Sequence, residues 1–463
     1  MSAQELLTTE ALQRLLHESH PGVRLTSFEA TEGSGRGDNY TAVLYRVEAR
    51  GRQHNGLRRG VGGREGEEEA GADAAEEEVV PWKGSFILKA LPENPETREA
   101  YQSESLFRNE IAFYTRALPA LLDFQTRMGS RQPFRGVPTC FHAEGDLIVL
   151  EDLRCRGFQM ADRKAGLDMA HIEAALPLLA RLHALSLAMR QAEPKQFKAL
   201  IEDSVREVMF TPENESWYRS YYRSASRAAC SIVRDAFPDS DVYLRRLQEF
   251  ADDGFFQRMV DLVSAETAEL KDRIGSPPDS RYGIPLVLCH GDCWTNNIMF
   301  RYDHGSVPGV SGSRRITEVC LLDFQMARVG SPALDLASLL YCCTSRDLRR
   351  NHLERLLDLY LSSLRGALSD LVTDGGEELL SRETLAHEMA RCSRFGLGIA
   401  LDMIPISTCD SNVAPDLYSA GGGVLSAQDE GPEKFELLKA PPSAEGRRRM
   451  SELVQELVDN SYL

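Results

Sequence analysis

Two segments of the chain carry the residue types and the spacing that phosphoryl transfer to a hydroxyl group requires. Residues 290–294 (HGDCW) place Asp292 in a turn after an apolar run, and Asn297 follows five positions later. Residues 320–325 (CLLDFQ) place Asp323 at the end of a second apolar run. The reaction needs one carboxylate that orients the alcohol and accepts its proton, and further oxygen atoms that hold magnesium. Asp292 is therefore a candidate base, and Asn297 and Asp323 are candidate magnesium ligands. For the first segment alone, the alternative is a surface turn, in which Asp and Asn are common.

The elements around these segments are predicted to be short strands. Residues 286–289, 298–300 and 316–322 are rich in β-forming apolar side chains. The glycine-rich stretch 303–313 is predicted to be the loop that joins the last two. In such a hairpin the start of one strand lies beside the end of the other. The sequence therefore predicts that the two candidate magnesium ligands lie at the same end of a hairpin.

The first third of the chain is predicted to form a small sheet with one helix. Alternating β-formers and turn residues predict five strands, at about 23–28, 40–47, 85–90, 139–142 and 147–150. An apolar stripe predicts a helix from about Glu99 to Leu118, ended by Pro119. Between the second and third strands, residues 50–79 are mostly Gly, Ala, Arg and Glu. This segment has too few apolar side chains to fold, so we expect a disordered acidic insertion.

The rest of the chain is predicted to be mainly helical. Apolar stripes at helical spacing predict helices at 172–189, within 195–275, and at 334–342, 351–365, 381–404 and about 450–458. The expected fold class is α+β. We expect a first domain at 20–152, with an antiparallel sheet and one helix, and a larger helical domain at 153–463.

Composition and charge limit the class of protein. Of the 463 residues 42% are hydrophobic, so the chain can bury a substantial core. Its 53 basic and 70 acidic residues give a net charge of −17, which argues against general binding to nucleic acid or to an anionic membrane.

No apolar run approaches the roughly 18 residues of a membrane span, and the first 20 residues are predicted to be an amphipathic helix rather than a signal peptide. We expect a cytoplasmic protein with ten reduced cysteines. A zinc site made by Cys289, His290, Cys293 and Cys320 is disfavoured, because these residues lack the repeated spacing of zinc ligands.

As a set, three motifs resemble the kinase-like phosphotransferases of the aminoglycoside and choline kinase branch. They are residues 290–297 (HGDCWTNN), 322–325 (LDFQ) and 330–336 (GSPALDL). Within that branch the chain is most similar to the ecdysteroid kinase-like family, also described as CHK kinase-like. The resemblance extends from about residue 20 to 405, with the acidic insertion as the clear departure. It implies a two-lobe fold of the protein-kinase type that uses ATP and Mg²⁺.

The resemblance assigns roles to the residues that match the motifs. It implies that Asp292 is the catalytic base, that His290 braces the loop of the base, and that Asn297 and Asp323 ligate magnesium. Asp335 would anchor the same loop; a plain helix N-cap is the alternative for this residue.

The resemblance also implies a nucleotide site in the first domain. Lys89 would pair with the phosphates, and Glu110 would fix that lysine. The remaining candidates are three glycines of a phosphate-covering turn and three hinge residues beside the adenine: Gly33, Gly35, Gly37, Glu151, Asp152 and Leu153.

The acceptor that the family implies is a small-molecule alcohol, either an ecdysteroid or another lipophilic alcohol such as a xenobiotic. The walls of its cleft are predicted to be mainly apolar. The residues expected to form them are Met209, Phe210, Trp217, Tyr221, Phe395, Leu397, Ile399 and Met403. One alternative is a choline- or aminoglycoside-type kinase for a cationic alcohol, with Trp217, Tyr218, Tyr221 and Tyr222 supplying the aromatic faces. The other is a catalytically inactive binding module. The presence of Lys89, Asp292, Asn297 and Asp323 argues against inactivity. The acceptor hydroxyl and the oligomeric state stay open.

Overall fold

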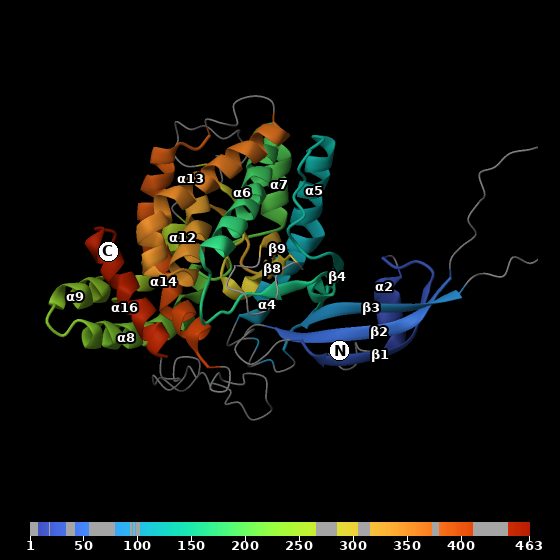
Figure 1. The fold of residues 1–463 in the computed structure, drawn as a ribbon, viewed down its shortest axis with the longest axis horizontal. Helices are drawn as coiled ribbons and strands as arrows, with labels where there is room; N and C mark the ends of the chain where they lie inside the picture. The colour runs from blue at the N-terminus through green and yellow to red at the C-terminus, as the bar shows by residue number, and fades with distance from the viewer. Residues whose placement is uncertain are drawn as a thin grey trace, which may run out of the picture.

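A computed structural model describes residues 8–17, 19–33, 42–54, 79–92, 95, 98, 102–264, 285–303, 315–372, 379–410 and 443–463. An antiparallel sheet and a helical lobe lie at opposite ends of the molecule (Figure 1). The predicted α+β class is confirmed.

The N-terminal sheet contains the five predicted strands in the order β1-β2-β3-β5-β4, all antiparallel to their neighbours. Their bounds are β1 Val23–Glu32, β2 Val43–His54, β3 Val79–Ala90, β4 Cys140–Glu144 and β5 Leu147–Glu151.

The predicted acidic insertion begins later in the structure than we expected. Strand β2 continues to His54, which pairs with Val79 of β3, so the assignment of residues 50–54 to a disordered insertion was wrong. Backbone hydrogen bonds between strands need no apolar side chains, and β2 and β3 can therefore extend past the core. Residues 55–78 lie outside the described part of the chain.

Two helical segments flank the sheet. Helix α2 (Thr9–Leu16) buries Leu12 and Leu16 against strand residues that include Phe86, so the first lobe contains a helix N-terminal to the predicted boundary at residue 20. The predicted helix at 99–118 appears as α4 (Ser103–Ala112), which continues through a π-helical turn, η1 (Phe113–Ala117), into α5 (Leu118–Arg127).

The prediction that Pro119 ends this helix was wrong. Pro119 lies in the first turn of α5, directly after the π-helical turn. A proline needs no N–H partner at a helix start, and it is well tolerated there.

Nine helices are described in the C-terminal lobe. They are α6 (Met169–Ala192), α7 (Pro194–Asp203), α8 (Glu215–Ala236), α9 (Asp241–Phe250), α10 (Phe255–Ser264), α12 (Pro332–Cys343), α13 (Arg346–Leu371), α14 (Arg382–Thr408) and α16 (Ala444–Asp459). Helix α6 packs along α13, and α12 packs along α14. By length and composition α6 could cross a membrane, but 72% of its apolar window is buried inside the molecule. That burial is typical of a core helix.

Short strands at the base of this lobe position the two motif segments. One sheet has the order β6-β8-β9, from β6 (Phe158–Met160), β8 (Ile298–Tyr302) and β9 (Ile316–Leu321), and a second ribbon pairs β7 (Val287–Cys289) with β10 (Arg328–Gly330). Strands β6 and β10 were not predicted, because three residues are too few to show an alternating pattern. The predicted loop between β8 and β9 lies outside the described residues except for Asp303.

Candidate active site

The turn that carries Asp292 depends on a glycine. Strand β7 ends at Cys289, and Gly291 adopts φ +88°. A Cβ atom at this position would lie 1.8 Å from the carbonyl oxygen of Met326. Only glycine combines this backbone conformation with such a close approach.

Asp335 holds the same turn through its backbone. Its Oδ2 accepts a hydrogen bond from the N–H of His290 (2.6 Å) and its Oδ1 accepts one from the N–H of Gly291 (2.9 Å). Burial alone raises the pKa of the Asp335 carboxyl, but the hydrogen bonds it receives outweigh burial and keep that pKa below its ordinary value. The N-cap of α12 is Ser331, so the plain N-cap interpretation of Asp335 was wrong.

Two buried residues that the sequence analysis did not select support Asp335. His183 of α6 lies 3.1 Å from Asp335 Oδ2 through its Nε2 atom, and its Nδ1 atom lies 2.8 Å from the hydroxyl of Tyr360 in α13. An ionised Asp335 accepts, so His183 Nε2 donates to it and Tyr360 donates to His183 Nδ1. A histidine inside an apolar helix gave no distinct sequence signal.

His290 connects the two motif segments. Its Nε2 atom donates to the carbonyl oxygen of Leu322 (2.8 Å), and its Nδ1 atom accepts from the N–H of Asp292 (3.2 Å). Burial lowers the pKa of His290, which keeps the ring neutral, as this pattern of one donor and one acceptor requires. The ring also packs on Phe324, with centroids 4.5 Å apart. The structure thus places His290 where it can brace the loop. Among the described residues, no metal-type cluster joins His290 with Cys289, Cys293 and Cys320.

Asn297 lies beside the carboxylate of Asp292. Its Nδ2 atom donates to Asp292 Oδ2 (2.8 Å) and to the Asp292 carbonyl oxygen (3.0 Å). The amide oxygen of Asn297 consequently points away from Asp292, and the Oδ1 atom of Asp292 is left for another partner. Burial, followed by the charge of Asp323, raises the pKa of Asp292 to about 7, although Asn297 acts against the rise.

Asp323 lies beside this pair because of the hairpin register. Ile298 pairs with Leu321, and the N–H of Leu322 donates to the carbonyl oxygen of Asn297 (2.8 Å). Asp323 itself adopts φ +62°, a left-handed conformation that is uncommon for residues other than glycine. The predicted arrangement, with both candidate magnesium ligands at one end of the hairpin, is observed.

Lys89 bridges the two lobes. Its Nζ atom lies 2.5 Å from Glu110 Oε2 in α4 and 2.8 Å from Asp323 Oδ1, and both Lys89 and Glu110 are buried. Burial lowers the pKa of Lys89, but the two carboxylates outweigh burial and hold that pKa above its ordinary value. A cation at this position can neutralise bound phosphates.

Asn109 is a second residue that the sequence analysis missed. Its Nδ2 atom donates to the carbonyl oxygens of Gln325 (2.9 Å) and Ala327 (2.8 Å), and its Oδ1 atom accepts from the N–H of Arg206 (3.0 Å). These bonds tie α4, which carries Glu110, to the segment after Asp323. Nothing in the sequence separates Asn109 from other polar residues of a helix.

Of the three glycines of the predicted phosphate-covering turn, the structure describes Gly33. It directly follows β1 and donates its N–H to the carbonyl oxygen of Leu44 (2.8 Å), whereas Gly35 and Gly37 lie outside the described residues.

The three predicted hinge residues lie at the end of β5: Glu151 is its last residue, and Asp152 and Leu153 follow it. The carboxylate of Glu151 accepts from the N–H of Thr139 (3.1 Å), and that of Asp152 accepts from Ser85 Oγ (2.8 Å). Leu153 is buried beneath them. The side chains of Glu151 and Asp152 thus hold the connection between the lobes.

The donor set fits magnesium and nucleotide phosphates. Magnesium prefers oxygen ligands from one or two carboxylates together with phosphate oxygens. The Asp323 carboxylate and the Asn297 amide oxygen meet this preference, and Lys89 lies within reach of the same place. With nucleotide bound, Lys89 would serve the phosphates and Asp323 the metal.

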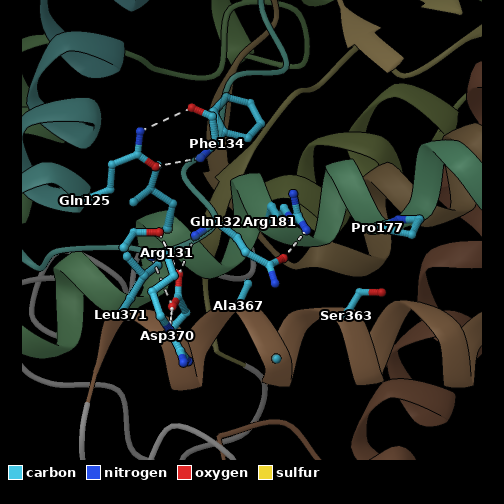
Figure 2. A pocket seen from close by; sticks show the side chains of 13 residues that line it. Gln125, Arg131, Gln132, Phe134, Pro177, Arg181, Ser363, Ala367, Asp370 and Leu371 are labelled. Carbon is cyan, nitrogen blue, oxygen red and sulfur yellow. Dashed lines mark hydrogen bonds and ion pairs between the residues drawn. The ribbon is translucent and has the colours of Figure 1, made fainter. Parts of the chain in front are cut away.

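A separate pocket of about 210 Å³ lies between α5, α6 and α13 (Figure 2). Its polar side chains bond one another: Asp370 accepts from Ser130 (2.7 Å) and from Arg131 (3.0 Å), and Gln132 accepts from Arg181 (2.5 Å). The pocket includes none of the predicted site residues.

A two-lobe fold with a Lys–Glu pair in one lobe, and with a base loop and metal-type ligands in the other, defines a kinase-like phosphotransferase that acts on an alcohol. The chain belongs to the ecdysteroid kinase-like family, whose model matches residues 36–373. It is a small-molecule kinase of the ecdysteroid kinase type.

Two solved structures are similar to the chain in part. The choline kinase LicA from Streptococcus pneumoniae has 11% sequence identity and a TM-score of 0.34, with 97% of this chain and 98% of that chain covered. A microcompartment-associated aminopropanol kinase has 13% identity and a TM-score of 0.28, with 86% and 99% covered. No curated protein is similar enough to this chain to match.

Proposed function

We propose that the protein transfers the γ-phosphate of ATP, in the presence of Mg²⁺, to a hydroxyl group of a small lipophilic alcohol such as an ecdysteroid or a xenobiotic. One observation carries the proposal: Asn297 orients the Asp292 carboxylate and leaves one of its oxygens open, beside Asp323 and Lys89. A turn with a purely structural role has no need for two carboxylates and a lysine ammonium group at one place.

Each residue has a distinct part in the proposed reaction. Magnesium and ATP, when bound, supply an electrophilic phosphorus and neutralise charge on the phosphate oxygens. Asp292 Oδ1 accepts the proton of the acceptor hydroxyl while the hydroxyl oxygen bonds to phosphorus and the bond to the leaving ADP breaks. His290 and Asp335 keep the loop rigid, so that the carboxylate stays within about 3 Å of the hydroxyl.

The acceptor side of the C-terminal lobe supports a lipophilic skeleton. Predicted wall residues Phe210, Tyr221 and Phe395 belong to one aromatic and aliphatic core, in which Phe210 and Phe395 have centroids 6.0 Å apart. Two acids, Asp402 and Glu207, lie among the described residues of this region, and Glu207 is neutralised by Arg328 at 3.0 Å.

A cationic alcohol is the second candidate, and the buried carboxylate of Asp402 beside Tyr221 favours it (3.2 Å). A quaternary ammonium group is stabilised by aromatic faces and a nearby carboxylate. Arg328 opposes it, because a quaternary ammonium group accepts no hydrogen bond from the unpaired guanidinium atoms.

The test is phosphate transfer by purified protein. Steroid, choline and aminoglycoside panels are incubated with ATP and Mg²⁺, and mass spectrometry detects products heavier by one phosphate group. Asp239→Asn, at an exposed position of the α8–α9 turn, serves as the active control. Transfer to lipophilic alcohols supports the proposal, transfer to choline alone supports the second candidate, and no transfer to any panel contradicts both.

We also propose a cytoplasmic location, as expected from the sequence. None of the ten cysteines forms a disulfide, which supports a reducing compartment.

A further inference from the structure

Buried polar atoms without partners gather in one region of the C-terminal lobe. The Oδ1 atom of Asp402, the hydroxyl of Tyr222 and the Nε and Nη2 atoms of Arg328 have no hydrogen-bond partner among the described residues. Their residues are 4%, 1% and 2% exposed. More than nine tenths of buried polar groups in native proteins are paired. Such a concentration therefore indicates a partner that the described part of the chain does not supply.

The three residues border one aromatic cluster. Tyr222 packs on Phe210, with centroids 6.0 Å apart, and Phe210 packs on Phe395 at the same distance. The guanidinium carbon of Arg328 lies 5.1 Å from the centre of the Phe395 ring. On the other side, Tyr221, whose ring is 5.3 Å from that of Tyr222, donates to Asp402 Oδ2.

This region adjoins the candidate base. Arg328 of β10 pairs with Cys289 of β7, three positions before Asp292. Asp402 lies on α14, which packs along α12 and against α8 (Figure 1). The negative charge of Asp402 is also among the causes that raise the pKa of Asp292, after burial and Asp323. A ligand whose hydroxyl reaches Asp292 can thus extend toward these atoms.

The unpartnered atoms differ in chemistry, and this difference restricts the ligand. A carboxylate oxygen accepts a hydrogen bond, a guanidinium donates, and a tyrosine hydroxyl does both. A purely hydrocarbon ligand satisfies none of them. A simple cation satisfies Asp402 but accepts no hydrogen bond from Arg328. Hydroxyl groups satisfy all three because each one both donates and accepts.

We propose that Asp402, Tyr222 and Arg328 bind hydroxyl groups of the acceptor that are not phosphorylated, so that the enzyme selects a polyhydroxylated alcohol with an apolar skeleton. This inference rests on the proposed function, and it adds three specificity-determining residues to it. The rings of Phe210 and Phe395 pack against the skeleton, and the polar atoms fix its orientation over Asp292.

Two variants test the inference. Each should weaken binding of the alcohol substrate without lowering the stability of the fold. Tyr222→Phe removes a hydroxyl that has no partner in the free protein, and Asp402→Asn replaces the unpartnered acceptor with an amide. Removing an unsatisfied buried polar group does not destabilise the fold. The matched control is Tyr341→Phe, because the Tyr341 hydroxyl of α12 is bonded to Ser393 Oγ (2.8 Å) of α14, the helix that carries Asp402.

The probes are ecdysone, which carries several hydroxyl groups, and pregnenolone, which carries one. We expect the KM for ecdysone to rise about tenfold in Tyr222→Phe and in Asp402→Asn, with the KM for ATP unchanged and the melting temperature equal or higher. The control should lower the melting temperature and leave the KM for ecdysone unchanged. We also expect wild-type protein to prefer ecdysone to pregnenolone by kcat/KM.

Outcomes that overturn the inference differ from those that overturn the proposed function. If ecdysone is phosphorylated but both variants keep the wild-type KM, or if both melt lower as the control does, the three residues serve packing and the inference fails. Equal kcat/KM for the two steroids also refutes it. If ecdysone raises the melting temperature of wild-type protein without ATP, and the variants lose this shift, but no phosphate is transferred, the binding site stands and the kinase proposal fails.

Discussion

Replacing Asp292 with asparagine separates catalysis from stability. Asparagine has nearly the same shape, and its amide oxygen can still accept the hydrogen bond from Asn297 that Asp292 Oδ2 accepts (2.8 Å). It cannot take the proton of an acceptor hydroxyl. Removal of a general base typically costs about 10²- to 10⁴-fold in rate, so we expect kcat to fall by that factor.

The stability of the same variant should not fall. Burial raises the pKa of Asp292 to about 7, whereas an unfolded aspartate titrates near 3.9. At any pH between these two values, the folded state holds a proton that the unfolded state has lost. The free energy of unfolding therefore declines as pH rises through that window. The upper limit of this decline is about 4 kcal/mol, at about 1.4 kcal/mol for each pH unit of the window.

The assay compares Asp292→Asn with wild type and with the exposed control Asp239→Asn. Phosphate transfer and urea unfolding are measured at pH 5 and pH 8. We expect the variant to lose activity by the factor above, and to exceed wild type in stability slightly at pH 5 and by more at pH 8, because the window begins near pH 3.9. For wild type, kcat/KM should fall about tenfold per pH unit below pH 7, because the base becomes protonated. Asp292→Asn with more than half the wild-type rate, or with lower stability than wild type at pH 8, would refute the reasoning.

Three further substitutions test other parts of the molecule. Asp323→Asn should raise the Mg²⁺ concentration for half-maximal activity about tenfold, because a ligand charge is lost; an unchanged magnesium titration would remove Asp323 from the metal site. Gly291→Ala should lower kcat at least about tenfold with little change in the KM for ATP, because the new Cβ meets Met326 and the loop must shift; wild-type kinetics would show that the loop tolerates the shift. Arg349→Met leaves the buried carboxylate of Glu456 without its partner (2.6 Å), so urea unfolding should report a loss of about 3–5 kcal/mol. A loss below about 1 kcal/mol would mean that water reaches Glu456.

Local patterns predicted much of the fold and the centre of the site. The five strands of the first lobe were visible because each alternates and ends at turn residues. Asn297 and Asp323 could be placed at one hairpin end because a strand begins directly after the first and another ends directly before the second. The assignment of Lys89 and Glu110 came from the family resemblance, since two residues 21 positions apart in the chain give no signal that they lie side by side.

Tertiary contacts account for what the sequence did not reveal. Asn109 and His183 act through bonds to residues 97 to 218 positions away, so no local pattern in the chain reveals their partners. Pro119 misled because a proline ends a helix only where its missing N–H would be needed, and the preceding π-helical turn removes that need.

The acceptor side shows why composition alone is a poor guide to specificity. Tyr222 lies on an amphipathic helix and Asp402 on a largely buried one, and their apolar and aromatic neighbours predicted an apolar cleft. Specificity depends instead on which buried polar atoms lack a partner, and that property belongs to no single segment. Arg328 is paired on one side with Glu207 and unpartnered at Nε and Nη2, so only the folded structure reveals it as a donor. A folded chain that leaves a hydrogen-bond donor and a hydrogen-bond acceptor unsatisfied in one buried region gives up stability there. Selection for binding an alcohol substrate that pairs with both atoms explains why such a sequence persists.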